Sequence, residues 1–321
     1  MRIYLIILLV LLKVTSCNFS REESEVITTA TLKGPSAMAM IKMIEEKPIL
    51  NGELKTEFKI SNEPDQVRAM VMNGDVDFAV LPSTMAALLY NKEQPYILAA
   101  IPVWGTLYLF GTDTALHSWE DLKGKKISLM GRGMTPDVLF RFLATKNGLD
   151  PDKDLQLNYS FPGHIELANA IISGNSDLGV ISEPLATMVM KKNPSVVPIL
   201  DLNLEWEKVF GGTVPFAQTA LIVRRDLAEK SKETVDDYLS FLQESITWVN
   251  QNPSAASELI VKYEIMPDTA MGRISIPRCN LRYAGAYKEM KGIQEYLKVF
   301  FNFNPLTIGG KLPDEEFYYK E

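Results

Sequence analysis

Four small hydroxyl side chains stand where helices are expected to begin, just after a strand: Ser36, Ser83, Thr84 and Thr135. A hydroxyl at such a position can cap the helix, which stabilises it by about 0.5–2 kcal/mol. The free N–H groups and the positive end of the helix dipole also attract an anionic or strongly polar group. Helix capping and direct ligand contact explain these residues equally well, and both can hold for one residue. The chemistry that they indicate is binding.

Three longer polar side chains could add contacts to a ligand. Arg132 lies between two glycines and could pair with a carboxylate, sulfonate or phosphate, although a solvated loop arginine gives the same pattern. Glu183 precedes a proline, and it could contact a ligand amine or stabilise a helix start through its charge. Gln218 could offer an amide contact.

Two aromatic side chains lie on the segments that are expected to connect two halves of the molecule. Trp104 and Phe216 could enclose a flat or apolar part of a ligand between them. Packing in the core is the competing explanation for both residues.

The sequence shows no arrangement typical of catalysis or metal binding. His117 and His164 are the only histidines, and neither has a metal-like spacing to another histidine, cysteine or carboxylate. No Gly-x-Ser-x-Gly turn is present, and no serine or cysteine has a convincing histidine partner. The segment 131–136 lacks the third glycine of a dinucleotide fingerprint and the lysine of a P-loop. We therefore predict no catalytic residue, no metal site and no cofactor.

The overall composition is that of a folded, acidic, soluble protein. The 321 residues are 46% hydrophobic and 23% charged, and they are enough for two domains with cores of their own. A net charge of −7 argues against nucleic acid as a partner, because phosphate recognition needs basic patches.

The chain repeats itself at a distance of one hundred residues. Residues 73–89 align with residues 173–189, with four identical pairs: Gly74/Gly174, Asp77/Asp177, Val80/Val180 and Ala86/Ala186. Solenoid repeats recur every 20–50 residues or so, whereas this period has the size of a small domain. The duplication predicts two similar α/β lobes.

The elements expected around the repeat place the candidate residues at one cleft. Strand and helix patterns alternate over 26–91, an extended run covers 97–111, and a returning strand is expected at 219–223. We predict two Rossmann-like lobes joined by two crossing strands, with lobe 1 formed by 26–108 and 219–321 and lobe 2 by 109–218. The later helices 235–250, 255–263 and 287–300 are expected to pack on lobe 1. Ligands of such sheets bind beyond the carboxyl ends of the strands, so hinge closure of two lobes would enclose one.

The first 25 residues are expected to direct and anchor the protein. Residues 1–17 combine a short apolar run with a small-residue tripeptide before Cys17, which resembles a lipoprotein signal with its lipobox. An ordinary signal or a membrane anchor with an incidental cysteine is the alternative. Residues 18–25 would form a polar tether. Only Cys279 remains, so no disulfide is expected.

These features resemble the substrate-binding lipoproteins of bacterial ABC importers, in particular the group of nitrate, sulfonate, taurine and thiamine-precursor binding proteins. The resemblance rests on the signal and lipobox, the two repeats that begin Asp77-Phe-Ala-Val and Asp177-Leu-Gly-Val, and the segment Trp119-Glu-Asp-Leu-Lys-Gly-Lys-Lys-Ile. It covers residues 26 to about 317. It implies the type II periplasmic binding protein fold, and a membrane permease with its ATPase as partners.

The expected function is a lipid-anchored, monomeric solute-binding component of an ABC importer on the periplasmic or extracellular face, and not an enzyme. Lys33 and Arg132, at equivalent turns, favour an anionic solute, while the two aromatic residues allow a ring. Two alternatives remain: an enzyme of the same fold, resembling chorismate dehydratases or the pyrimidine synthases of thiamine synthesis, or a surface sensor.

Overall fold

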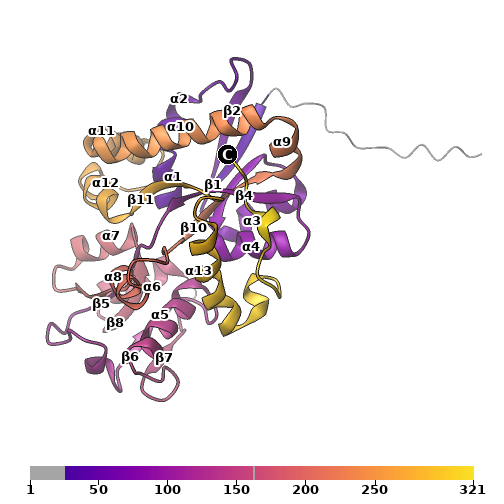
Figure 1. Ribbon diagram of the computed structural model, residues 1–321. Helices are drawn as coiled ribbons and strands as arrows, with labels where there is room; N and C mark the ends of the chain where they lie inside the picture. Colours follow the sequence, from indigo (N-terminus) through magenta and orange to yellow (C-terminus); the bar gives the residue numbers. More distant parts are fainter. Residues whose placement is uncertain (1–25, 162) are drawn as a thin grey trace, which may run out of the picture.

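The computed structural model describes residues 26–161 and 163–321. Within these residues the chain forms two mixed sheets, each flanked by helices (Figure 1). The α/β fold with two lobes is therefore confirmed. The predicted signal 1–17, the lipidated Cys17 and the tether 18–25 lie outside the described residues. No helix in the described part of the chain has the length and apolar character needed to cross a bilayer.

The first lobe is built on the larger sheet. Among the described residues this sheet has six strands in the order β11-β4-β10-β3-β1-β2, with bounds β1 Val26–Leu32, β2 Lys55–Ser61, β3 Phe78–Pro82, β4 Tyr96–Val103, β10 Thr219–Arg224 and β11 Leu281–Gly285. Strands β1, β2 and β3 are parallel, whereas β10 runs antiparallel to both of its neighbours. The helices of this lobe are α1 Pro35–Ala39, α2 Ile41–Glu46, α3 Pro64–Asn73, α4 Ser83–Asn91, α9 Arg225–Lys230, α10 Lys232–Gln251, α11 Pro253–Lys262, α12 Thr269–Ser275 and α13 Met290–Phe303, with short 3-10 turns η2 Ile276–Arg278, η3 Pro305–Ile308 and η4 Glu315–Phe317.

The second lobe repeats the plan of the first. Its sheet has, in the described part of the chain, five strands in the order β7-β6-β8-β5-β9, with bounds β5 Leu107–Gly111, β6 Lys126–Ser128, β7 Gln156–Asn158, β8 Leu178–Ser182 and β9 Val197–Asp201. Its helices are α5 Thr135–Lys146, α6 His164–Ile172, α7 Leu185–Lys192 and α8 Leu202–Phe210, with the 3-10 turn η1 Glu120–Leu122. Three parallel strands are again followed by an antiparallel strand, β5. The order β7-β6-β8-β5-β9 thus matches β2-β1-β3-β10-β4.

The chain crosses between the lobes twice, through short segments. The expected strand over 97–111 is interrupted at Trp104–Thr106, and each half joins a different sheet. Leu107 and Tyr108, which the sequence assigned to lobe 1, pair with β8 in the second sheet. The chain packs tightly at this break: a Cβ on Gly105 would lie 2.2 Å from Asn203 Oδ1 and 2.4 Å from Phe216 Cδ1, which favours glycine there.

An apolar core continues from one lobe into the other on the side of α13. Trp206 of α8 lies 5.5 Å from Tyr296 of α13 and 5.2 Å from Phe216, measured between ring centroids. Helix α13 contacts α4 of the first lobe and α5 of the second. The sequence had placed this helix on lobe 1 alone. The lobes are therefore joined by packed aromatic side chains as well as by the two crossings.

Candidate functional site

The carboxyl ends of the two sets of parallel strands face each other across the lobes. The crossings leave the first sheet after Val103 of β4 and re-enter it at Thr219 of β10, which pairs with Pro82 at the end of β3. In the second sheet, Leu107 pairs with Ser182 at the end of β8. At the turn after β1, a Cβ on Gly34 would lie 3.5 Å from Pro184 Cδ. The strand-end turns of the two lobes are thus in contact, and we call this region the lobe interface.

Hydroxyl groups at the lobe interface are buried without a hydrogen-bond partner in the protein. They come from Thr31 at the end of β1, Ser83 at the start of α4, Thr219 at the start of β10, and Thr187 in α7 of the second lobe. Of the nine buried side-chain polar atoms that lack a partner among the described residues, five belong to this region, the fifth being Arg278 Nη2. Leaving one such group unpaired costs about 1–3 kcal/mol. Their concentration in one place indicates a site for a polar group that the protein itself does not provide.

An ion pair connects the two lobes at the same place. Arg278 Nε in η2 donates to Glu183 Oε1, and Glu183 Oε2 accepts from the Thr187 backbone N–H at 3.1 Å. The Glu183 side chain is fully buried and that of Arg278 is 26% exposed. The Arg278 guanidinium carbon lies 4.6 Å from the centroid of the Tyr108 ring. Burial raises the pKa of Tyr108 to about 12, so its phenol is protonated at neutral pH.

The predicted amide contact, Gln218, connects the two crossings to each other. Its Oε1 accepts from the Thr106 N–H at 2.8 Å, and its Nε2 donates to Thr106 Oγ1 at 2.9 Å. Its backbone carbonyl accepts from the N–H of Ser83 at 3.2 Å. Gln218 therefore fixes the position of Ser83 relative to the connection between the lobes.

The two predicted aromatic contacts are buried beside the crossings. Trp104 donates from Nε1 to the Arg282 carbonyl at 2.7 Å, and the Arg282 guanidinium lies 4.0 Å from its ring centroid. Phe216 packs on Trp206 within the core that the lobes share. Trp104 and Phe216 thus both have the environment expected of residues that pack in the core.

The remaining predicted residues differ in exposure. Ser36 is buried in the first turn of α1, and Thr84 and Thr135 are partly buried in the first turns of α4 and α5. The Arg132 side chain is 70% exposed, and its nearest carboxylate, that of Asp152, lies at 4.0 Å. The N–H of the neighbouring Gly133 already donates to the buried Asp137 carboxylate at 2.7 Å. The Asp137 carboxylate thus already accepts from the backbone at the start of α5.

Four residues of the lobe interface were missed by the sequence reasoning: Thr31, Thr187, Thr219 and Arg278. Thr31 and Thr219 lie at the ends of expected strands, where threonine is common for its β propensity alone. Thr187 and Arg278 belong to no motif. The repeat could have singled out Thr187, because Ala87 stands at the equivalent position.

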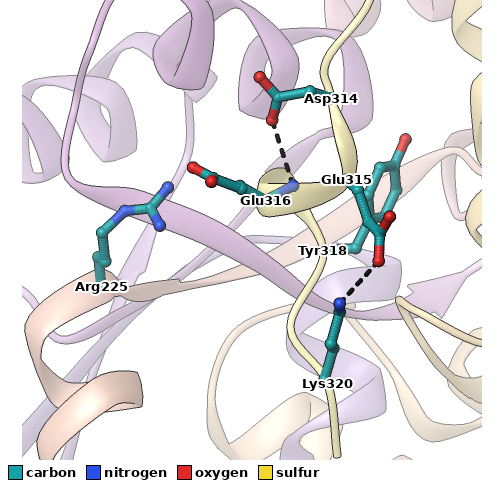
Figure 2. A pocket seen from close by; sticks show the side chains of 6 residues that line it. All are labelled: Arg225, Asp314, Glu315, Glu316, Tyr318 and Lys320. Atoms are coloured by element: carbon teal, nitrogen blue, oxygen red, sulfur yellow. Dashed lines mark hydrogen bonds and ion pairs between the residues drawn. The ribbon is translucent and has the colours of Figure 1, made fainter.

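A shallow surface pocket of about 680 Å³ lies elsewhere, along the C-terminal segment of the first lobe (Figure 2). Figure 2 shows Glu315 paired with Lys320, and Asp314 accepting from the Glu316 N–H, opposite Arg225. Three carboxylates face two cations here, so the pocket is not suited to an anion. Within the described residues, no group of three histidine, cysteine, aspartate or glutamate side chains is placed to hold a metal ion.

Cys279, next to Arg278, is expected to be unreactive in the folded protein. Its thiol is fully buried, 3.7 Å from Met38 Sδ, and burial raises its pKa well above the usual value. Thiolate is the reactive form, so the peptide that contains Cys279 should take up no iodoacetamide at pH 8. The same peptide should be fully alkylated in guanidinium chloride. Alkylation in the native protein, measured by mass spectrometry, would show that this packing is wrong.

Comparison with known proteins agrees with this fold. A crystal structure of an ABC transporter protein from Parabacteroides distasonis superimposes with a TM-score of 0.81 at 29% identity, covering 93% of this chain and all of that one. The periplasmic aliphatic sulphonate binding protein SsuA from Escherichia coli has the same fold, with a TM-score of 0.72 at 15% identity over 92% of both chains. The protein YtlA of Bacillus subtilis (strain 168) is 26% identical over 153 residues, which are 47% of this chain and 42% of that relative.

A model of one protein family matches most of the chain. The match covers residues 40–259, and the family is described as the phosphonate periplasmic substrate-binding protein of ABC transporters. The sequence-based resemblance to substrate-binding proteins of ABC importers is thereby confirmed. The chain belongs to the family of ABC transporter phosphonate periplasmic substrate-binding proteins.

Proposed function

We propose that this protein captures a small oxyanion, such as an alkylphosphonate or alkylsulfonate, at the lobe interface and delivers it to an ABC permease. The observation that carries the proposal is the group of buried, unpaired hydroxyls on Thr31, Ser83, Thr187 and Thr219. A phosphonate or sulfonate group presents three oxygens, each able to accept from a hydroxyl or a backbone N–H. The family description and the fold of SsuA support the same class of ligand.

Most of the unpaired donors at the lobe interface are uncharged hydroxyls, and the exception is Arg278 Nη2. The carboxylate of Glu183 and the guanidinium of Arg278 neutralise each other, while Lys33, which precedes Gly34, and Arg132 are exposed. An oxyanion there would be held by hydroxyl dipoles and by the N-terminus of α4, the nine-residue helix that Ser83 begins. Such donors need no counter-ion.

Hinge motion supplies the route into the site. The hydroxyls are buried because the two lobes touch at Gly34 and Pro184, so a ligand enters when the lobes separate. The aromatic core around Trp206 keeps the lobes joined on the α13 side while the polar side opens.

The protein acts as a carrier and not as a catalyst, and it works as a monomer. Lipidation of Cys17 would anchor it to a membrane on the periplasmic or extracellular face, near its permease and ATPase partners.

Thermal unfolding with and without oxyanions tests this proposal. A ligand at one hundred times its dissociation constant stabilises the folded state by about 2.7 kcal/mol, which raises the melting temperature by several degrees. We expect this for at least one of methylphosphonate, ethanesulfonate and their aryl analogues. No stabilisation by any of them would contradict the proposal.

Ser83→Ala separates binding from stability. Removing a buried hydroxyl that has no partner should leave the protein as stable as the parent without ligand, or slightly more stable. The same change should weaken oxyanion binding about three- to tenfold in calorimetric titration, because one hydrogen bond is lost. Ser240→Ala, at an exposed position of α10, is the control that should change neither quantity. Equal affinity of the Ser83→Ala variant and the parent would remove Ser83 from the site.

A further inference from the structure

The ion pair between Glu183 and Arg278 is the one ionic contact between the lobes among the described residues. Every other ion pair in that part of the chain joins two residues of the same lobe. Arg278 belongs to η2, which follows α12 of the first lobe, and Glu183 follows β8 of the second. In Figure 1 α12 lies directly above α7, away from α13. The lobes are thus held by an apolar contact at α13 and by an ionic contact at α12.

Each partner of the pair is prepared for this contact by its own lobe. Glu183 is anchored through both ends: its backbone N–H donates to the Thr106 carbonyl at 3.1 Å, and its Oε2 accepts from the Thr187 N–H. Arg278 is followed by Cys279, buried against Met38, and by Asn280, whose carbonyl accepts from the Trp104 N–H at 3.2 Å. Among the described residues, neither side chain forms a second salt bridge. Separation of the lobes would leave both charges without an ionic partner.

We propose that the Glu183–Arg278 pair is an interlobe latch that sets the balance between separated and closed lobes. The latch refines the proposed function, because it regulates access to the same site. A hydrogen bond between two charged groups contributes about 1.5–3 kcal/mol, so its loss changes the ratio of separated to closed molecules at least tenfold. One donor, Arg278 Nη2, is not used by the pair, so an oxyanion could join the latch without displacing Glu183.

The test measures lobe separation with no ligand added. Spin labels on Lys153→Cys of lobe 2 and Glu258→Cys of lobe 1, both exposed, report the distance between lobes by pulsed electron paramagnetic resonance. In this background, Glu183→Gln should increase the ratio of separated to closed molecules at least tenfold. Arg278→Gln should do the same, and the double variant should be no more open than either single variant, because all three lose one interaction.

Two further variants separate a latch from a loss of folding or packing. Arg278→Lys keeps the positive charge and should retain part of the closure, whereas a role in packing alone predicts the same result as for glutamine. Glu45→Gln breaks an exposed ion pair with Lys262 inside lobe 1 and should leave the distance unchanged. Near-ultraviolet circular dichroism confirms that each variant is folded. An unchanged distance distribution in folded Glu183→Gln would overturn the latch.

The latch and the proposed function can fail independently. If the parent binds no oxyanion but Glu183→Gln still opens the lobes, the latch holds and the ligand class is wrong. If oxyanions bind and the folded variant stays closed, the ligand class holds and the latch is wrong.

Discussion

Trp206→Ala is expected to lower the free energy of unfolding by about 3–5 kcal/mol, the range for truncating a buried tryptophan. The indole has no exposed surface, and its Nε1 donates to the Val214 carbonyl at 2.8 Å. Its ring contacts Phe216 and Tyr296, as well as two aromatic residues of its own lobe. The truncation would leave a cavity and an unpaired carbonyl at the junction of the lobes. Urea unfolding followed by far-ultraviolet circular dichroism measures the change.

Trp206→Phe is the matched control for this prediction. It keeps a six-membered aromatic ring but loses the five-membered ring of the indole with its Nε1 donor, so it leaves a smaller cavity and should destabilise the protein less than the alanine variant. A Trp206→Ala variant within 1 kcal/mol or so of the parent would contradict a shared aromatic core at α13.

Asp137→Ala should destabilise the protein by a similar amount, about 3–5 kcal/mol, because the buried Arg141 guanidinium loses its one buried carboxylate and keeps only the exposed carboxylate of Asp152. The Asp137 carboxylate is fully buried and accepts from Arg141 Nε at 2.8 Å, Tyr159 Oη at 2.6 Å and the Gly133 N–H at 2.7 Å. The Arg141 side chain is only 9% exposed. Burial and the hydrogen bond to Asp137 raise the pKa of Tyr159 to about 12, so its phenol remains a donor at neutral pH.

Asp152→Ala tests whether burial decides the size of this effect. The Asp152 carboxylate accepts a hydrogen bond from Arg141 Nη1 at 2.8 Å, but the Asp152 side chain is 66% exposed. Exposed ion pairs contribute about 0–1 kcal/mol, so this variant should unfold close to the parent in urea. Comparable losses in the two variants would show that the Asp137 network is not a buried one.

The repeat in the sequence predicted the architecture because it reports on strand order. Two copies of a βαβαβ pattern leave few ways to build two sheets, and the structure has the expected pair. Identical residues in the repeat did not keep identical roles, however. Asp77 is buried and accepts from the Thr28 N–H and from Arg224, whereas Asp177 is exposed. Arg224 ends β10, and the equivalent strand of the second lobe ends at Gly111, which offers no cation.

Sequence reasoning found only part of the lobe interface, because much of that region is created by tertiary contacts. Ser83 was expected from its place at a helix start. Arg278 is 95 positions from Glu183 in the chain, in a 3-10 turn before a strand that no pattern had indicated. The aromatic residues Trp104 and Phe216 were compatible with either ligand contact or core packing, and no local pattern distinguishes the two.

A crystal structure of the protein grown with its most stabilising phosphonate or sulfonate tests the central idea most directly. Electron density for the oxyanion should appear at the lobe interface, with oxygens within hydrogen-bond distance of Ser83 and at least one of Thr31, Thr187 and Thr219. Density found only outside that interface, for example beside Arg132 or in the acidic pocket around Glu316, would contradict solute capture between the lobes.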